Sequence, residues 1–113
     1  MSRRQSDNAR RFRRLTLRIL VDYSSPTGHR CDYATTLGAG GLFVETDEMI
    51  PPGTTLKLRF RLPEGETLHE IEGRVCWQRA DAAGAVEAPG MGIQFTDSFG
   101  CAQLARELED LQL

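Results

Sequence analysis

The chain has 113 residues, a length that suits one domain. Hydrophobic residues make up 40% of it and charged residues 27%, which is typical of a folded globular protein and excludes a disordered, collagen-like or coiled-coil chain. No apolar stretch approaches the roughly 20 residues that cross a bilayer, and no apolar segment follows the N-terminal arginines. The sequence therefore predicts a cytoplasmic protein with neither a membrane span nor a signal peptide.

The formal net charge of −2 is unevenly distributed along the chain. Residues 1–18 contain seven arginines and one acid, a balance of +6, and the other 95 residues contain seven basic and fifteen acidic groups, a balance of −8. A basic segment joined to an acidic body indicates either a solubilising tail or an anion-binding segment. All seven bases are arginine, whose planar group binds phosphate through two hydrogen bonds and stacks on flat rings. This composition favours a specific anion.

From Leu15 onward, apolar and polar residues alternate in short runs separated by turn residues. The predicted strands are residues 15–23, 31–37, 42–45, 56–62, 71–78 and 91–95. In the fifth run, alternation places Trp77 on the same face as Ile71 and Val75, and Gly73 is expected to mark a bend or bulge. Six short strands with such turns indicate a sandwich or a barrel.

The end of the chain has a helical pattern. Leu104, Leu108 and Leu111 are spaced i, i+4 and i+7 with acids between them, which predicts one amphipathic helix over about residues 99–112. Its narrow apolar stripe is expected to cap the barrel, with an oligomer contact as the alternative. The predicted fold is therefore all-β with a C-terminal helix. We expect a flexible basic arm over residues 1–9 and a barrel domain with its helix over residues 10–113.

Sequence motifs of catalysis are missing. The chain contains no nucleophile elbow, metalloprotease helix or phosphate-binding loop. His29 and His69 lie far apart in the sequence, and the three cysteines do not have metal-ligand spacing. The acids at positions 64, 66, 70 and 72 fall on a turn and a solvent-facing strand. We therefore predict a binding domain with no catalytic residues, no metal and no resident cofactor.

The stretch from Gly38 to Gly41 is rich in glycine but matches no dinucleotide-binding fingerprint. One interpretation is a tight turn or bulge whose glycines need positive φ angles. The other is a backbone that approaches a ligand closely and offers its N–H groups. The sequence leaves both open.

Four stretches occur in an order that resembles a known family. They are residues 10–14 (RRFRR), 36–46 (TLGAGGLFVET), 75–77 (VCW) and 89–95 (PGMGIQF). From about Arg10 to Leu111 the chain resembles the PilZ domain, the bacterial receptor module for cyclic di-GMP. It is most similar to the single-domain PilZ subfamily common in myxobacteria and their relatives. The resemblance implies a six-stranded antiparallel barrel with a C-terminal helix, in agreement with the strand pattern.

The resemblance also implies a site for cyclic di-GMP. In the family an R-x-x-x-R motif clasps the phosphates and stacks on guanines; Arg10 and Arg14 match it, and Arg11 lies between them. The second motif, D/N-x-S-x-x-G, here has Thr36, Gly38 and Gly41, so only its glycine is kept. The missing side chains would contribute about 2–4 kcal/mol to binding. Their loss predicts an affinity on the order of 30- to 1,000-fold weaker.

Three functions remain open. The first is a cyclic di-GMP receptor that relays a signal to a protein partner, with motility, polysaccharide or developmental machinery as the partners the family suggests. The second is an adaptor that binds no nucleotide, for which Phe12, Leu20 and the stripe of the helix are the expected contact surface. The third and most remote is a nucleic-acid-binding barrel. It is disfavoured because Phe12 is the only aromatic residue in the basic segment and the body is acidic.

Overall fold

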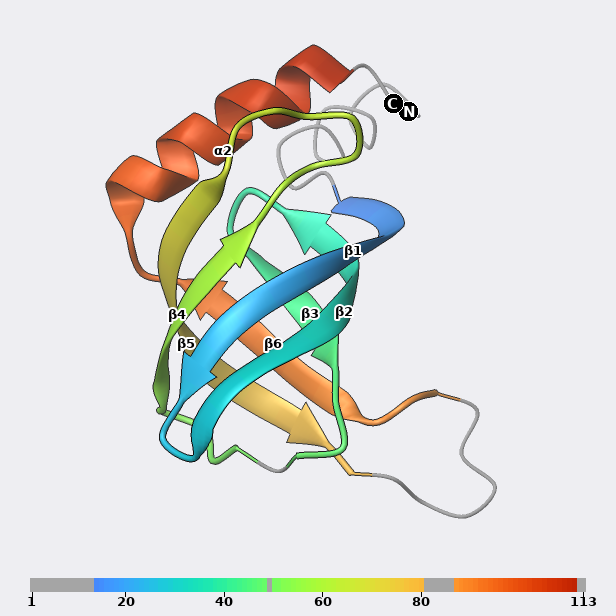
Figure 1. The fold of residues 1–113 in the computed structure, drawn as a ribbon, viewed down its shortest axis with the longest axis vertical. Coiled ribbons are helices and arrows are strands. Elements are labelled where there is room, and N and C mark those ends of the chain that lie inside the picture. Colours follow the sequence, from blue (N-terminus) through green and yellow to red (C-terminus); the bar gives the residue numbers. More distant parts are fainter. Residues whose placement is uncertain (1–13, 49, 81–86, 112–113) are drawn as a thin grey trace, which may run out of the picture.

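Six antiparallel strands close into a barrel, and one helix follows them (Figure 1). The computed structural model describes residues 14–48, 50–80 and 87–111. The elements are β1 (Arg14–Ser25), β2 (Gly28–Gly38), β3 (Gly41–Glu45), β4 (Thr55–Phe60), β5 (His69–Arg79), β6 (Gly90–Phe95) and α2 (Ser98–Leu111). The strand order around the barrel is β1-β2-β3-β6-β5-β4. The predicted fold class, a six-stranded antiparallel barrel with a C-terminal helix, is confirmed.

Period-2 alternation gives each strand one face inside the barrel. In β4, for example, Leu56, Leu58 and Phe60 are buried while Lys57 and Arg59 between them are exposed. Side chains from all six strands meet in a single hydrophobic cluster, to which Leu104 of α2 also belongs. The barrel interior is therefore a packed core, and any binding surface must lie on its outside or at its ends.

The alternation is interrupted in β5, where the pairing register with β6 shifts between Val75 and Trp77. The extra residue of this bulge turns both Cys76 and Trp77 outward, and Trp77 is 47% exposed. The prediction that Trp77 shares the inner face with Val75 is therefore wrong. Gly73 is not at the bulge; a Cβ there would lie 2.6 Å from Cγ2 of Ile93, so close packing requires the glycine.

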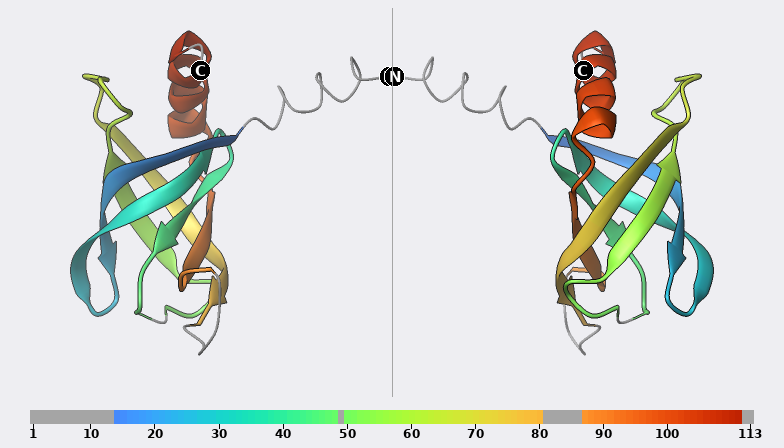
Figure 2. Two further views of the ribbon diagram at one scale, coloured as in Figure 1. Left: turned by 90° about the vertical axis from the view of Figure 1, so that its right-hand side faces the viewer. Right: turned by 90° about the vertical axis from the view of Figure 1, so that its left-hand side faces the viewer.

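Helix α2 lies over one end of the barrel, next to β5 (Figure 2). Leu104 is fully buried and Leu108 is partly buried against the core. The carboxylate of Glu107 pairs with Nε2 of the buried His69 on β5. Asp97 caps the first turn by accepting a hydrogen bond from the Gly100 N–H at 3.0 Å. The helix thus caps the barrel as predicted, and the buried part of its stripe is not available as an adaptor surface.

Within the described ranges, the only helix is too short and too polar to span a membrane.

A buried phenol links β1 to β2. Tyr23 is 1% exposed, and its hydroxyl donates a hydrogen bond to Oδ2 of Asp32 at 2.6 Å. The same carboxylate accepts a hydrogen bond from Nε of Arg30 at 3.2 Å. Burial and the hydrogen bond to Asp32 raise the pKa of Tyr23 from 10.0 to about 12. The fold therefore favours the neutral phenol.

We expect the Leu104→Ala substitution to lower the free energy of unfolding by about 2–5 kcal/mol, because it leaves a cavity between the helix and the barrel. Urea denaturation measures this loss. The exposed neighbour Gln103 provides the control, since Gln103→Ala should change stability by less than about 0.5 kcal/mol. Equal effects of the two variants would contradict the packing of α2 on the core.

The raised pKa of Tyr23 predicts a loss of stability at high pH. The unfolded phenol loses its proton near pH 10 and the folded one near pH 12, so its contribution is complete below pH 10 and disappears as the pH rises to 12. Two pKa units correspond to about 2–3 kcal/mol. Denaturation at several pH values should show this decline in the parent and a shallower one in Tyr23→Phe. Parallel curves would refute the assignment.

Candidate functional site

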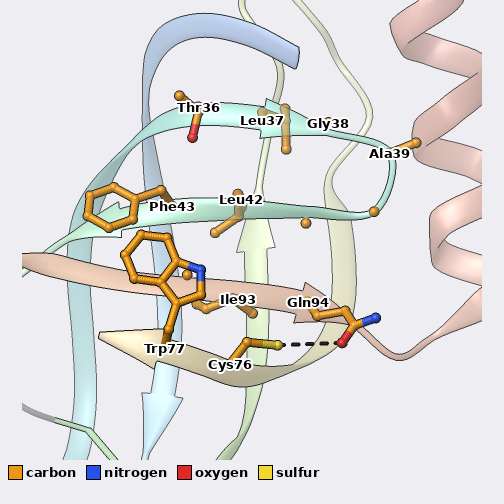
Figure 3. Close-up of a pocket in the computed structure, with 13 residues that line it drawn as sticks. Thr36, Leu37, Gly38, Ala39, Leu42, Phe43, Cys76, Trp77, Ile93 and Gln94 are labelled. Atoms are coloured by element: carbon orange, nitrogen blue, oxygen red, sulfur yellow. Dashed lines mark hydrogen bonds between the residues drawn. The ribbon is translucent and has the colours of Figure 1, made fainter. Parts of the chain in front are cut away.

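A hollow of about 350 Å³ lies on the outside of the barrel, where the β2–β3 hairpin meets β5 and β6 (Figure 3). Residues 36–43, 76–77 and 92–94 line it, and none of these is charged. We call it the glycine hollow, because four of its lining residues are glycines: Gly38, Gly40, Gly41 and Gly92. It is open, uncharged and floored by backbone, which suits a flat ligand that approaches the strands closely.

Strand pairing aligns five positions in one row across this face: Arg14, Gly38, Gly41, Gln94 and Arg74. The two glycines in the middle leave the row without side chains there. Gln94 and Arg74 are exposed at one end of the row. At the other end, the backbone of Arg14 is the direct partner of Gly38, on a neighbouring strand about 4.8 Å away.

Close packing, and not an unusual φ angle, requires one glycine of the stretch, Gly41. In the described residues, positive φ occurs only at Gly28, Gly53 and Glu64, so the interpretation that the stretch from Gly38 to Gly41 needs positive φ is wrong. A Cβ at Gly41 would lie 2.2 Å from the carbonyl oxygen of Ile93. Only glycine therefore lets β3 pair with β6 in this register.

An aromatic platform forms one wall of the hollow. Trp77 stacks on Phe43, with ring centroids 5.3 Å apart and planes inclined by 23°. A Cβ at Gly92 would lie 2.3 Å from Nε1 of Trp77, so the absence of a side chain there lets the indole lie against β6. The guanidinium carbon of Arg79 lies 4.6 Å from the centroid of the Phe43 ring, and this cation–π contact helps to hold the aromatic pair in place. The rest of the indole is exposed on the outside of the barrel.

A pair of polar side chains forms the opposite wall. The bulge in β5 turns Cys76 outward, and its thiol donates a hydrogen bond to Oε1 of Gln94 at 3.4 Å (Figure 3). Both side chains are exposed. Thr36 contributes the hydroxyl group of the β2 side.

Three of the predicted ligand residues lie together in the glycine hollow: Thr36, Gly38 and Gly41. Arg10 and Arg11 lie outside the described residues, and so does the side chain of Arg14. Three further residues that line the hollow were not predicted as site residues: Cys76, Trp77 and Gln94. The alternation of Met91, Ile93 and Phe95 leaves Gln94 on the outer face, but no signal in the sequence indicates that it would lie beside the stretch containing Thr36.

The profile of the PilZ domain family matches residues 8–109, which is most of the chain. The chain belongs to the PilZ domain family. The resemblance to the PilZ domain identified in the sequence is thereby confirmed, and the three positions of the second motif lie on the described barrel. A search of curated proteins found no match.

Solved PilZ structures share the fold. The Bacillus subtilis inhibitor of motility, MotI/DgrA, superposes with a TM-score of 0.71 at 20% identity, over 89% of this chain and 50% of that one. This chain therefore spans about half of that protein. The PilZ domain of CeSA from a cellulose-synthesising bacterium gives 0.60 at 22% identity, over 85% and 97% of the two chains. The PilZ domain of Escherichia coli YcgR, solved with c-di-GMP, gives 0.65 at 13%, over 90% of each.

We expect Gly41→Ala to destabilise this PilZ domain by about 1–3 kcal/mol, because the new methyl group would collide with the β6 backbone. Gly40→Ala is the matched control: a Cβ there meets nothing within 4 Å, so stability should be kept or slightly increased. Thermal unfolding of the two variants measures the difference. If Gly41→Ala is as stable as Gly40→Ala, the proposed constraint on the β3–β6 register does not exist.

Proposed function

We propose that this PilZ domain is a bacterial signalling module of the cyclic di-GMP receptor class, which acts in the cytoplasm through protein contacts and catalyses no reaction. The observation that carries the proposal is the strand register. Arg14, the last residue of the R-x-x-x-R motif, pairs with Gly38, and Gly38 pairs with Gly41, so the two family motifs adjoin. Arg10, Arg11 and Arg14 would hold the phosphates over the glycine hollow.

The hollow is electrostatically suited to an anion despite the acidic body of the chain. Since none of its lining residues is charged, a phosphate placed there meets no carboxylate in the wall. Gly38 and Gly41 also allow the ligand to approach the backbone at van der Waals distance. Arginines from the N-terminal segment would then supply the attraction that this face does not itself provide.

The aromatic platform offers a partial replacement for the missing motif side chains. Thr36 keeps one hydroxyl where the family has Asp or Asn, and Gly38 offers nothing in place of the serine. Stacking a base on an aromatic side chain contributes about 1–3 kcal/mol. Trp77 is half-exposed and already fixed by Phe43, so it would pay little conformational entropy on binding.

The proposed signal is an ordering of the basic segment. When its arginines bind the phosphates, the segment is drawn onto the face beside Thr36 and Gly41. The bound state then presents a surface that the free state lacks, and a protein partner recognises that surface. Components of motility, polysaccharide or developmental machinery are the partners that the family suggests.

A second function, an adaptor that binds no nucleotide, is favoured by a separate patch on β1 and β2. Leu20 and Tyr33 are direct cross-strand partners and are 51% and 41% exposed. The guanidinium carbon of Arg18 lies 4.3 Å from the centroid of the Tyr33 ring. Exposed Leu and Tyr beside an arginine have the composition of a protein interface. Phe12, also expected there, lies outside the described residues.

Calorimetric titration of cyclic di-GMP tests the receptor proposal. We expect binding that the Arg10→Ala/Arg14→Ala double substitution weakens by about 100-fold or more, because two charge-assisted contacts to phosphate are lost. A double substitution of the exposed Arg61 and Arg106 to Ala removes the same charge away from the hollow and should leave the affinity nearly unchanged.

The titration separates the candidate functions. The absence of heat at several hundred micromolar nucleotide would contradict the receptor and support the adaptor. Equal binding by the Arg10/Arg14 variant and the parent would reject the role of the arginines. Strongly salt-dependent binding of oligonucleotides without preference for cyclic dinucleotides would instead support the nucleic-acid-binding barrel.

A further inference from the structure

We infer that Gln94 selects the base of the bound nucleotide, by donating from its side-chain amide to the acceptor edge of a guanine that lies on Trp77. This inference rests on the proposed function. It assigns a specificity role to a residue outside both ligand motifs of the family.

The placement of Gln94 follows from the geometry of β6. Gly92 and Gln94 are two residues apart on one strand, so both face outward, with their Cα atoms about 7 Å apart. Trp77 lies against Gly92. A base stacked on the exposed indole therefore has Gln94 beside it, and the glutamine side chain is long enough to reach the edge of that base.

The amide of Gln94 is oriented by its neighbour. The thiol of Cys76 donates to Oε1 at 3.4 Å and so turns the acceptor end of the amide toward β5; the carbonyl oxygen of Arg74 is a second acceptor, 3.7 Å from the same sulfur. Among the described residues, Nε2 of Gln94 donates no hydrogen bond. Gln94 is exposed and its Nε2 points away from Cys76 (Figure 3). The end of the side chain that faces away from Cys76 is therefore a donor with two N–H groups.

A donor at this position distinguishes the two purines. Guanine presents two acceptors, O6 and N7, on one edge, whereas adenine presents the N6 amino donor in place of O6. The other groups in the hollow do not make this distinction. The hydroxyl of Thr36 both donates and accepts, and stacking on Trp77 tolerates any base. Among the side chains that line the hollow, Gln94 is therefore the one placed to select guanine.

The test compares the affinities for cyclic di-GMP and cyclic di-AMP by calorimetry. Gln94→Ala should bind cyclic di-GMP about two- to tenfold more weakly and leave cyclic di-AMP nearly unchanged, so the preference for guanine falls. Gln94→Glu should bind cyclic di-GMP about tenfold or more weakly, because its carboxylate would face the two acceptors O6 and N7. The affinity of this variant for cyclic di-AMP should fall less, because the carboxylate can accept a hydrogen bond from the N6 amino group.

Gln78→Glu is the matched control. Gln78 is also exposed on the β5–β6 pair, but it does not line the hollow, so this variant introduces the same charge without changing the site. It should keep the preference of the parent. Thermal unfolding verifies that all variants are folded.

The outcomes distinguish the inference from the proposed function. If the parent binds cyclic di-GMP and the Gln94 variants keep the affinity and preference of Gln78→Glu, the inference is overturned and the receptor stands. If the parent binds both nucleotides equally, the inference is likewise overturned. If the parent binds neither nucleotide, the proposed function fails and the inference fails with it.

Discussion

The close backbone contact between β3 and β6 is the constraint on which the rest of the site depends. A Cβ at Gly41 would lie 2.2 Å from the carbonyl oxygen of Ile93, so this pairing requires glycine. The register that it permits places Gly41 opposite Gln94 and Phe43 opposite Gly92. In the first pair, the side-chain amide of Gln94 lies beside a position that has no side chain. In the second pair, the ring of Phe43 lies beside Gly92, which also has none. This register thus supplies Phe43 to the platform and Gln94 to the polar wall.

The bulge in β5 completes the site at a cost in burial. Without the extra residue between Val75 and Trp77, the tryptophan would face the core and Cys76 alone would face outward. Exposing almost half of an indole gives up hydrophobic stabilisation. Stacking on Phe43 and the nearby guanidinium of Arg79 offset part of that loss. An aromatic side chain held outside the core by such contacts is typical of a binding surface.

Local patterns in the sequence predicted the barrel but only part of its site. Alternation in strands such as β4 is a local property, so each strand could be located without knowledge of its partners. The direction of Trp77, into or out of the barrel, could not be predicted in this way, because a bulge depends on how β5 pairs with β6. Trp77 pairs with Gly92, which lies 15 residues farther along the chain and beyond any local period. Thr36 and Gly38 were found through the family resemblance. Gln94 was missed because the pairing of β3 with β6, two strands far apart in the sequence, is what brings it beside the β2–β3 hairpin.

The departures from the second family motif do not by themselves decide against ligand binding. The side chains missing at Thr36 and Gly38 would contribute about 2–4 kcal/mol, whereas stacking on Trp77 contributes about 1–3 kcal/mol. The two ranges overlap, so stacking of a base on Trp77 would offset much of the loss. Stacking is less directional than a charge-assisted hydrogen bond and does not distinguish the bases. A receptor that relies on Trp77 for affinity therefore needs a separate group for selectivity, which Gln94 is placed to provide.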